Sequence, residues 1–259
     1  MTSSKEDVDA GPFDFMPDGF DGRRAALCLH GLTGTPYEVR PVADALVQRG
    51  MRCVAPVMAG HDVSAKQLAK TPYTAWVDLA RNALVELSET CEQVFIAGMS
   101  MGGLVALALA GENRADGIAV MGAPIRLPLY ISGLVPVVKY VYPYLSKSGG
   151  ADIQDEQARL RHPGLDAMPL ASVHELVKLQ RVVRGAIPKI TAPTFVGHGA
   201  LDRTANPKDA RSIFAGVNTD VRELRIGARS GHVVSVDHDG PEMVRAIANF
   251  FDGIGRRTR

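Results

Sequence analysis

Short apolar runs alternate with longer segments of helical spacing along the first half of the chain. The runs lie at 24–30, 52–56, 94–99 and 117–121, and the helical segments lie between them. Trp76, Leu79, Ala83 and Leu87 show the helical spacing most clearly. Strands that are apolar on both faces and alternate with amphipathic helices predict βαβ units and a mostly parallel sheet.

The alternation stops near Pro124 and resumes near Ala192. Residues 125–189 contain no clear strand, but Leu170 to Val183 carry a helical stripe, so we expect a helical insertion over the carboxyl ends of the strands. Ordinary crossover helices are the alternative. Strands are expected again at 192–197 and 221–226. The predicted organisation is an α/β, doubly wound core at 21–124 and 190–259, a cap at 125–189, and an N-terminal arm with a possible edge strand at 1–20.

Composition and charge exclude several classes of function. Hydrophobic residues make up 46% of the 259 residues, and a net charge of +1 gives no electrostatic case for binding nucleic acid. Leu127 to Leu145 is very apolar, but three prolines and Lys139 argue against stable membrane insertion. Three cysteines without framework spacing, and no recognisable secretory signal, predict a cytoplasmic location. No metal-ligand spacing and no Walker lysine occur, so neither a metal nor a cofactor is expected.

The pentapeptide Gly98-Met99-Ser100-Met101-Gly102 joins a predicted strand to a predicted helix. A G-x-S-x-G sequence in this context is typical of a nucleophile elbow, which exposes its serine at the edge of the sheet. The turn is so sharp that side chains two residues either side of Ser100 would collide, and Gly98 and Gly102 have none. The alternative is a tight turn with an incidental serine.

A serine hydroxyl needs a base within hydrogen-bond reach, and the base needs a third group to orient it. In a doubly wound sheet these groups are expected just after strands. Asp202 and His232 hold such positions, in the order expected after an elbow serine. The order therefore supports a triad of Ser100, Asp202 and His232.

The other histidines and aspartates have weaker claims. His30 is expected in the backbone turn after the first strand, His61 in a loop that could line the mouth of a pocket, and His198 at the end of a strand. Asp237 and Asp239 are expected at the start of the last helix, where carboxylates act as caps. None of these five is predicted to be catalytic.

Acyl transfer also needs donors for the developing oxyanion. The Met101 N–H begins the helix after the elbow, and the Leu32 N–H lies in the loop after the first strand. A simple turn between strand and helix is the alternative for the second loop. Thr35 and Glu38 are predicted to form a capping box, in which Thr35 caps the helix and Glu38 reaches back.

These segments resemble the α/β-hydrolase superfamily, and more closely its small bacterial carboxylesterases and monoacylglycerol lipases. The matching residues, which span Ala25 to about Gly253, are His30-Gly31-Leu32-Thr33-Gly34-Thr35 with Val39-Arg40, Gly60-His61, Gly98-Met99-Ser100-Met101-Gly102-Gly103, Ala192-Pro193-Thr194-Phe195, Asp202 with Asn206-Pro207, and Ser230-Gly231-His232-Val233-Val234 with Asp237. The resemblance implies an α/β-hydrolase fold with a small helical cap, the same triad, amides of Leu32 and Met101 as the oxyanion hole, and no cofactor. Leu32 replaces a frequent Phe, so the pocket is expected to differ in shape.

The sequence thus predicts a carboxylic ester hydrolase that acts on a small-molecule ester through an acyl-enzyme. The apolar stretch from Leu127 to Leu145 is expected to form an acyl-binding wall for short to medium chains. A thioesterase, a lactonase or a carbon–carbon hydrolase with the same triad is one alternative, and a non-catalytic ligand-binding protein on this fold is another. The oligomeric state is left open.

Overall fold

A computed structural model describes residues 8–62, 64–147 and 149–254 of the chain. Within those ranges seven strands form one sheet, in the order β1-β3-β2-β4-β5-β8-β9. Their bounds are β1 (Phe13–Phe15), β2 (Arg24–Leu29), β3 (Arg52–Ala55), β4 (Gln93–Met99), β5 (Gly117–Met121), β8 (Thr194–Gly199) and β9 (Arg222–Gly227). Only the edge strand β1 pairs antiparallel with its neighbour, so the mostly parallel sheet is confirmed.

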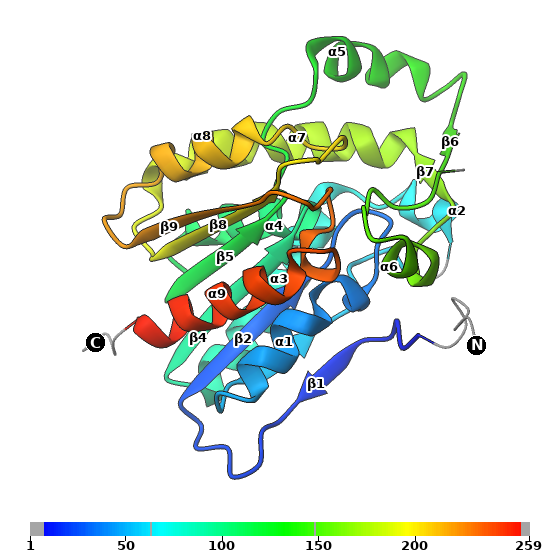
Figure 1. Ribbon diagram of the computed structural model, residues 1–259. Coiled ribbons are helices and arrows are strands. Elements are labelled where there is room, and N and C mark those ends of the chain that lie inside the picture. Colours follow the sequence, from blue (N-terminus) through cyan, green and yellow to red (C-terminus); the bar gives the residue numbers. More distant parts are fainter. Residues whose placement is uncertain (1–7, 63, 148, 255–259) are drawn as a thin grey trace.

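Helices cover both faces of the sheet (Figure 1). On one face lie α1 (Arg40–Val47) and α9 (Gly240–Gly253); on the other lie α3 (Tyr73–Thr90), α4 (Met101–Ala110), α7 (Leu170–Ala186) and α8 (Lys208–Gly216). Side chains of β4 alternate between the two layers: Ile96 packs with α3 and α4, whereas Phe95 packs with α9. Burial on both faces explains why the strands are continuous apolar runs.

Residues 125–189 form α5 (Leu129–Val138), β6 (Tyr144–Ser146), α6 (Glu156–Arg161), β7 (Ala167–Pro169), α7 and a 3₁₀ turn at Ile187–Lys189. The expectation that this stretch has no strand is wrong, because β6 and β7 pair antiparallel. Strands of three residues are too short to show an alternating pattern. Leu179 and Val183 of α7 join the main core, so α7 packs on the sheet layer, while α5 lies outside it (Figure 1).

Three shorter elements complete the described chain: η2 (Pro36–Val39), α2 (Ala65–Leu68) and η4 (Val234–Val236). Among the described helices, none has both the length and the hydropathy needed to cross a bilayer.

Candidate active site

Ser100 occupies the turn between β4 and α4 with a backbone φ of +54°. This left-handed conformation is rare for a residue with a side chain, and such strain gathers at functional sites. A Cβ on Gly98 would lie 2.4 Å from the Gly102 oxygen, and one on Gly102 would lie 2.1 Å from the Leu29 oxygen. Both positions therefore require glycine, as the elbow motif predicts.

The three side chains of the predicted triad meet beyond the carboxyl ends of β4, β8 and β9. His232 Nε2 lies 2.8 Å from Ser100 Oγ, and His232 Nδ1 lies 2.8 Å from Asp202 Oδ2. The Asp202 carboxylate accepts a hydrogen bond from Nδ1–H, so the neutral ring presents Nε2 as an acceptor to the serine hydroxyl. The arrangement can remove a proton from Ser100.

Electrostatics favour a charged Asp202 and a basic His232. Burial disfavours the Asp202 carboxylate, but hydrogen bonds from His198 and His232 and the charge of His232 outweigh burial and lower its pKa. The amides of Thr204 and Ala205 also donate to Asp202 Oδ1, at 2.8 and 2.7 Å. Burial likewise disfavours the His232 imidazolium, but the hydrogen bond and charge of Asp202 raise its pKa above the ordinary value.

His198 contributes to the site more directly than the sequence indicated. Its Nε2 lies 2.8 Å from Asp202 Oδ2, the same oxygen that accepts from His232, and its side chain is buried. His198 thus donates a second hydrogen bond to the oxygen of Asp202 that also accepts from His232. Its place four residues before Asp202 was the only sequence signal, because the contact depends on how the loop after β8 folds back.

The backbone around Leu32 and Met101 suits an oxyanion. Among the described residues, neither amide N–H has a hydrogen-bond acceptor. The loop carrying Leu32 lies close to the serine, since a Cβ on Gly31 would be 3.1 Å from Ser100 Cβ. Met101 begins α4, where aligned peptide dipoles favour negative charge. Two backbone donors without an acceptor among the described residues therefore belong to segments that adjoin Ser100.

The predicted capping box at Thr35 and Glu38 is wrong. Thr35 makes no side-chain cap, and its hydroxyl donates to the Pro163 carbonyl at 3.3 Å. Glu38 is buried and accepts from the Gly31 N–H at 2.7 Å and from His162 Nε2 at 3.0 Å. Burial opposes its charge, but the hydrogen bond and charge of His162, with the Gly31 amide, lower the pKa of Glu38 to about 2.

The insertion is bonded directly to the loop that carries His232. The Asp152 carbonyl accepts from the His232 amide at 2.8 Å, and Asp152 Oδ2 accepts from the Arg203 amide at 2.7 Å. Asp237 accepts from the amides of Gln154 and Gly231. The expectation that Asp237 caps the last helix is therefore wrong, because its carboxylate satisfies loop amides from the insertion.

Asp239 stands at the start of α9 but makes no side-chain cap. Its carboxylate accepts instead from Ser230 Oγ and the Arg229 amide, both at 2.8 Å. The capping role expected for this residue is therefore wrong as well. Asp239 holds the exit loop of β9 that leads to His232.

His30 and His61 support the loops beside the site. His30 Nδ1 donates to the Gly31 carbonyl at 2.9 Å, and its Nε2 accepts from the Met58 amide. His61 packs against His30 and Trp76. It does not line the cavity at Ser100, so its expected place at the pocket mouth is wrong.

A cavity of about 250 Å³ opens at Ser100. Its apolar wall comes from the first loop, the loop after His232 and the insertion: Leu32, Leu127, Met168, Val173, Leu176 and Val233. Among the described side chains of the stretch expected to form an acyl-binding wall, only Leu127 lines this cavity, while Leu134 and Tyr140 are exposed. Within the insertion, α7 contributes Val173 and Leu176 to the wall. Among the described residues, no group of His, Cys, Asp and Glu is arranged to hold a metal ion.

Comparison with known proteins agrees with this fold. A family model described as serine aminopeptidase, S33, matches residues 21–239. The carboxylesterase of Bacillus subtilis (strain 168) is 30% identical over 93% of this chain and 96% of its own length. The thermostable monoacylglycerol lipase of Bacillus sp. (strain H-257) is 27% identical over 89% and 91%. One solved structure, from work on the metagenome-derived lipolytic enzymes LipS and LipT, has a TM-score of 0.86 at 23% identity, covering 94% of this chain and 98% of that one.

Proposed function

The chain belongs to the serine aminopeptidase S33 family of α/β-hydrolases, and from this membership we propose that it is a carboxylic ester hydrolase with Ser100, His232 and Asp202 as its triad. One observation carries the assignment of residues: two hydrogen bonds of 2.8 Å connect Ser100 Oγ to Asp202 Oδ2 through the His232 ring. Relatives named as a carboxylesterase and a monoacylglycerol lipase support the ester as substrate.

The proposed reaction runs through an acyl-enzyme. Ser100 Oγ attacks the ester carbonyl while His232 Nε2 takes the proton of the Ser100 hydroxyl. The oxyanion that forms accepts hydrogen bonds from the N–H groups of Leu32 and Met101. The imidazolium is stabilised by Asp202, and it then protonates the departing alcohol oxygen. Water attacks the acyl carbon with His232 as base, which frees the carboxylic acid and restores Ser100.

The apolar cavity at Ser100 supports short to medium acyl chains. Its walls of Leu, Met and Val side chains would bury the apolar surface of an acyl chain. The carbonyl carbon of that chain would then lie at Ser100. We propose that residues 125–189 act as the cap that shapes this cavity, over a core of 21–124 and 190–259. This proposal is supported by Met168, Val173 and Leu176, which line the cavity.

We also propose a cytoplasmic location. Cys28, Cys53 and Cys91 are buried free thiols, as expected for a protein that folds in a reducing compartment.

Hydrolysis of p-nitrophenyl butyrate tests the proposal. Ser100→Ala should lower kcat by about 10⁴-fold or more, because nucleophile and base act as a unit. Ser88→Ala is the matched control, since Ser88 is exposed on α3 and bonds only to the Leu84 carbonyl. Labelling by a fluorophosphonate probe should require Ser100. Unchanged turnover in Ser100→Ala, or labelling that persists in it, would remove Ser100 from the mechanism.

A further inference from the structure

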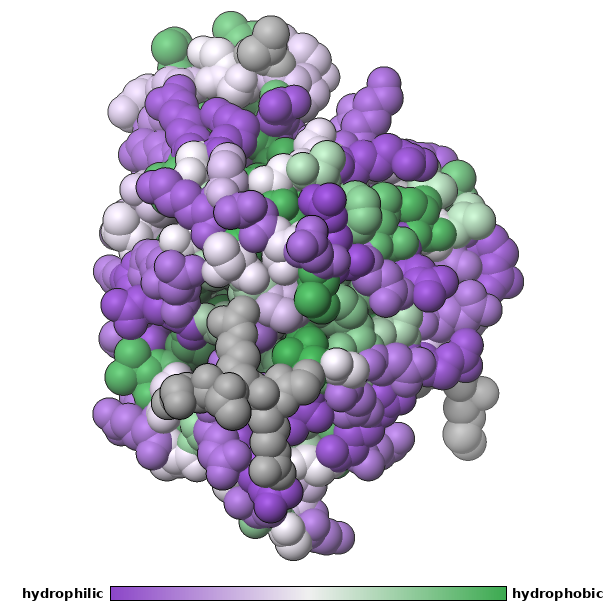
Figure 2. All heavy atoms as spheres, turned by 90° about the vertical axis from the view of Figure 1, so that its left-hand side faces the viewer, coloured by the Kyte–Doolittle hydropathy of each residue, from purple (hydrophilic) through white to green (hydrophobic). Residues whose placement is uncertain are grey.

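A second, larger hollow adjoins the cavity at Ser100. It measures about 1030 Å³ and lies between the start of α5, α7, α8 and the loop that carries Asp202. Leu127 and Thr204 line both spaces. In Figure 2 the raised top of the molecule is α5, and hydrophilic side chains cover much of the surface beneath it. The two spaces therefore lie side by side, with Leu127 and Thr204 at their common boundary.

The groove concentrates positive charge. It is lined by five of the 29 basic residues and by only two of the 28 acidic residues of the chain. The basic residues are Arg126, Arg181, Arg184, Arg203 and Lys208. The rest of the chain consequently has more acidic than basic residues, although the net charge of the whole is only +1. The local field, rather than the overall charge, favours an anion here.

The two acidic residues of the groove do not neutralise these cations. Asp202 is buried and bonded to His198, His232 and two backbone amides. Asp209 is also buried; burial raises its pKa, and its Oδ2 accepts from the Arg126 amide at 3.2 Å. Asp202 is therefore committed to the triad, and neither carboxylate forms an ion pair with the five cations, although the charge of Arg126 acts on Asp209.

The cations themselves have few partners. Arg184 donates to the Ile125 carbonyl at 2.9 Å, while the side chains of Arg126, Arg181, Arg203 and Lys208 form no ion pair with any described residue. All five are exposed. They can therefore reorient toward a ligand without first breaking an internal salt bridge.

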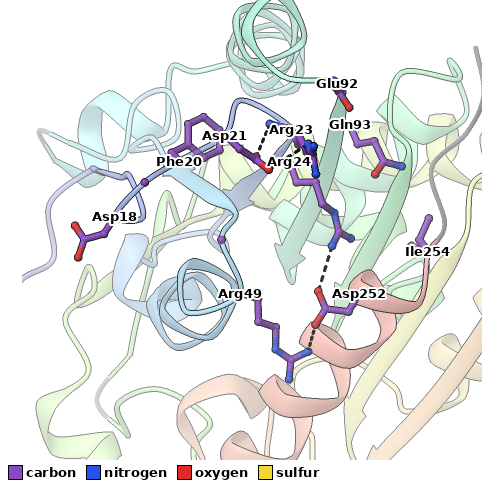
Figure 3. A pocket seen from close by; sticks show the side chains of 12 residues that line it. Asp18, Phe20, Asp21, Arg23, Arg24, Arg49, Glu92, Gln93, Asp252 and Ile254 are labelled. Atoms are coloured by element: carbon purple, nitrogen blue, oxygen red, sulfur yellow. Dashed lines mark hydrogen bonds and ion pairs between the residues drawn. The ribbon is translucent and has the colours of Figure 1, made fainter.

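The pocket in Figure 3 provides the contrast. It measures about 430 Å³ and lies at the other end of the sheet, beside the first residues of β2 and β4. Arg24 and Arg49 both pair with Asp252 there, at 3.2 and 2.8 Å, and Arg23 pairs with Asp21. The arginines of that pocket stabilise the fold, so a cluster of arginines is not by itself unusual in this protein. Beside the active site, by contrast, Arg126, Arg181 and Arg203 form no ion pair with any described residue.

We propose that the groove binds the anionic leaving group of the substrate, so that the enzyme prefers acyl esters or thioesters whose alcohol or thiol carries phosphate. This rests on the proposed function and names its substrate class. The acyl chain occupies the apolar cavity at Ser100, and the leaving group passes Leu127 and Thr204 to the basic side chains. The acyl C–O or C–S bond breaks, the leaving oxygen or sulfur takes the proton from His232, and water supplies the hydroxyl of the acid.

Substrate pairs matched in acyl chain test this preference. The ester pair is 1-hexanoylglycerol and 1-hexanoylglycerol 3-phosphate; the thioester pair is the N-acetylcysteamine and coenzyme A thioesters of hexanoic acid. The kcat/KM of the wild type at about 20 mM NaCl should be higher for the anionic member of at least one pair, and about 500 mM NaCl should reduce the difference. The pair that shows the effect identifies whether a phosphoglycerol or a nucleotide-bearing thiol is the source of the phosphate.

Two double variants remove the same charge from different places. Arg181→Gln with Lys208→Gln acts in the groove, whereas Lys189→Gln with Arg211→Gln removes two exposed cations outside it. The groove variant should lose about fivefold in kcat/KM for the anionic substrate, because each ion pair between an exposed cation and the phosphate contributes only a small free energy. For the neutral substrate the loss should be less than about twofold. The control variant should change neither by more than about twofold.

Binding without hydrolysis separates this inference from the proposed function. Titration calorimetry with free coenzyme A and with glycerol 3-phosphate on Ser100→Ala should show binding that weakens in the groove variant. Binding of this kind without any ester turnover would support the groove and contradict the proposed function. Ester turnover without anion preference, or equal losses in the groove and control variants, would overturn the inference and leave the ester hydrolase standing.

Discussion

Replacing Glu38 by Gln should both destabilise the protein and slow catalysis. The side chain of Glu38 is only 6% exposed, and its carboxylate bonds to His162 of the insertion and to the Gly31 amide. A glutamine has the same shape and can still accept from Gly31, but it carries no charge for His162. The substitution therefore measures the effect of the negative charge of Glu38, the buried group that joins the insertion to the loop of Leu32.

The magnitude follows from the pKa. The Glu38 pKa is about 2 in the folded protein against an ordinary value of 4.5. Each pKa unit corresponds to about 1.4 kcal/mol, so the charged form contributes about 3 kcal/mol to the free energy of unfolding at neutral pH. Because the folded pKa is depressed, this contribution is present above pH 4.5 and is lost as the pH falls toward 2.

Urea unfolding at pH 7 measures the loss. Glu38→Gln should lower the free energy of unfolding by about 3 kcal/mol, whereas Glu89→Gln on the exposed end of α3 should change it by less than about 0.5 kcal/mol. The same Glu38 change in a His162→Gln background should cost less, because the partner is already gone. The kcat for p-nitrophenyl butyrate should also fall about tenfold, since Gly31 helps to place the Leu32 donor. A loss below about 1 kcal/mol, or the same loss in both backgrounds, would refute the reasoning.

Three further predictions concern the triad and the elbow. His232 must be neutral to take the Ser100 proton, and Asp202 raises the pKa of His232, so kcat/KM should rise with pH through an apparent pKa above 6.5. An apparent pKa below 6.5 on the acid side of the pH profile would contradict this. His198→Ala removes one hydrogen-bond donor from Asp202 Oδ2, which makes Asp202 a stronger acceptor for His232, so kcat should fall and the acid side of the pH profile should move to higher pH. His198→Gln should restore both kcat and the pH profile. An unchanged pH profile in His198→Ala would exclude a positioning role for His198. Gly102→Ala places a Cβ 2.1 Å from the Leu29 oxygen and should cost about 3 kcal/mol or abolish folding, whereas Gly253→Ala, with no atom within 4 Å, should be tolerated; thermal unfolding of the two variants should differ accordingly.

The strands and the elbow could be predicted because they depend on neighbours in the chain. Apolar runs indicate the parallel strands of a sheet that is covered on both faces. The glycines around Ser100 are required because Gly98 lies against Gly102, four residues on, and Gly102 lies against Leu29 of the adjoining strand. Asp202 and His232 were identified by the same logic, since parallel strands bring their carboxyl ends to one edge. In the structure His232 lies 2.8 Å from Ser100 Oγ, and Asp202 lies 2.8 Å from His232, so the three side chains form one chain of hydrogen bonds.

The partners of the polar side chains could not be predicted. Glu38 follows Thr35 as a capping box would require, yet it bonds to His162, 124 residues away in the chain, because a buried carboxylate needs hydrogen-bond donors and the folded chain places His162 beside it. Asp237 likewise bonds to amides of the insertion. The sequence by itself determined the sheet, the elbow and the residue types at its edge. Only the tertiary structure decided how the insertion joins that edge, since distant loops satisfy the buried charges there.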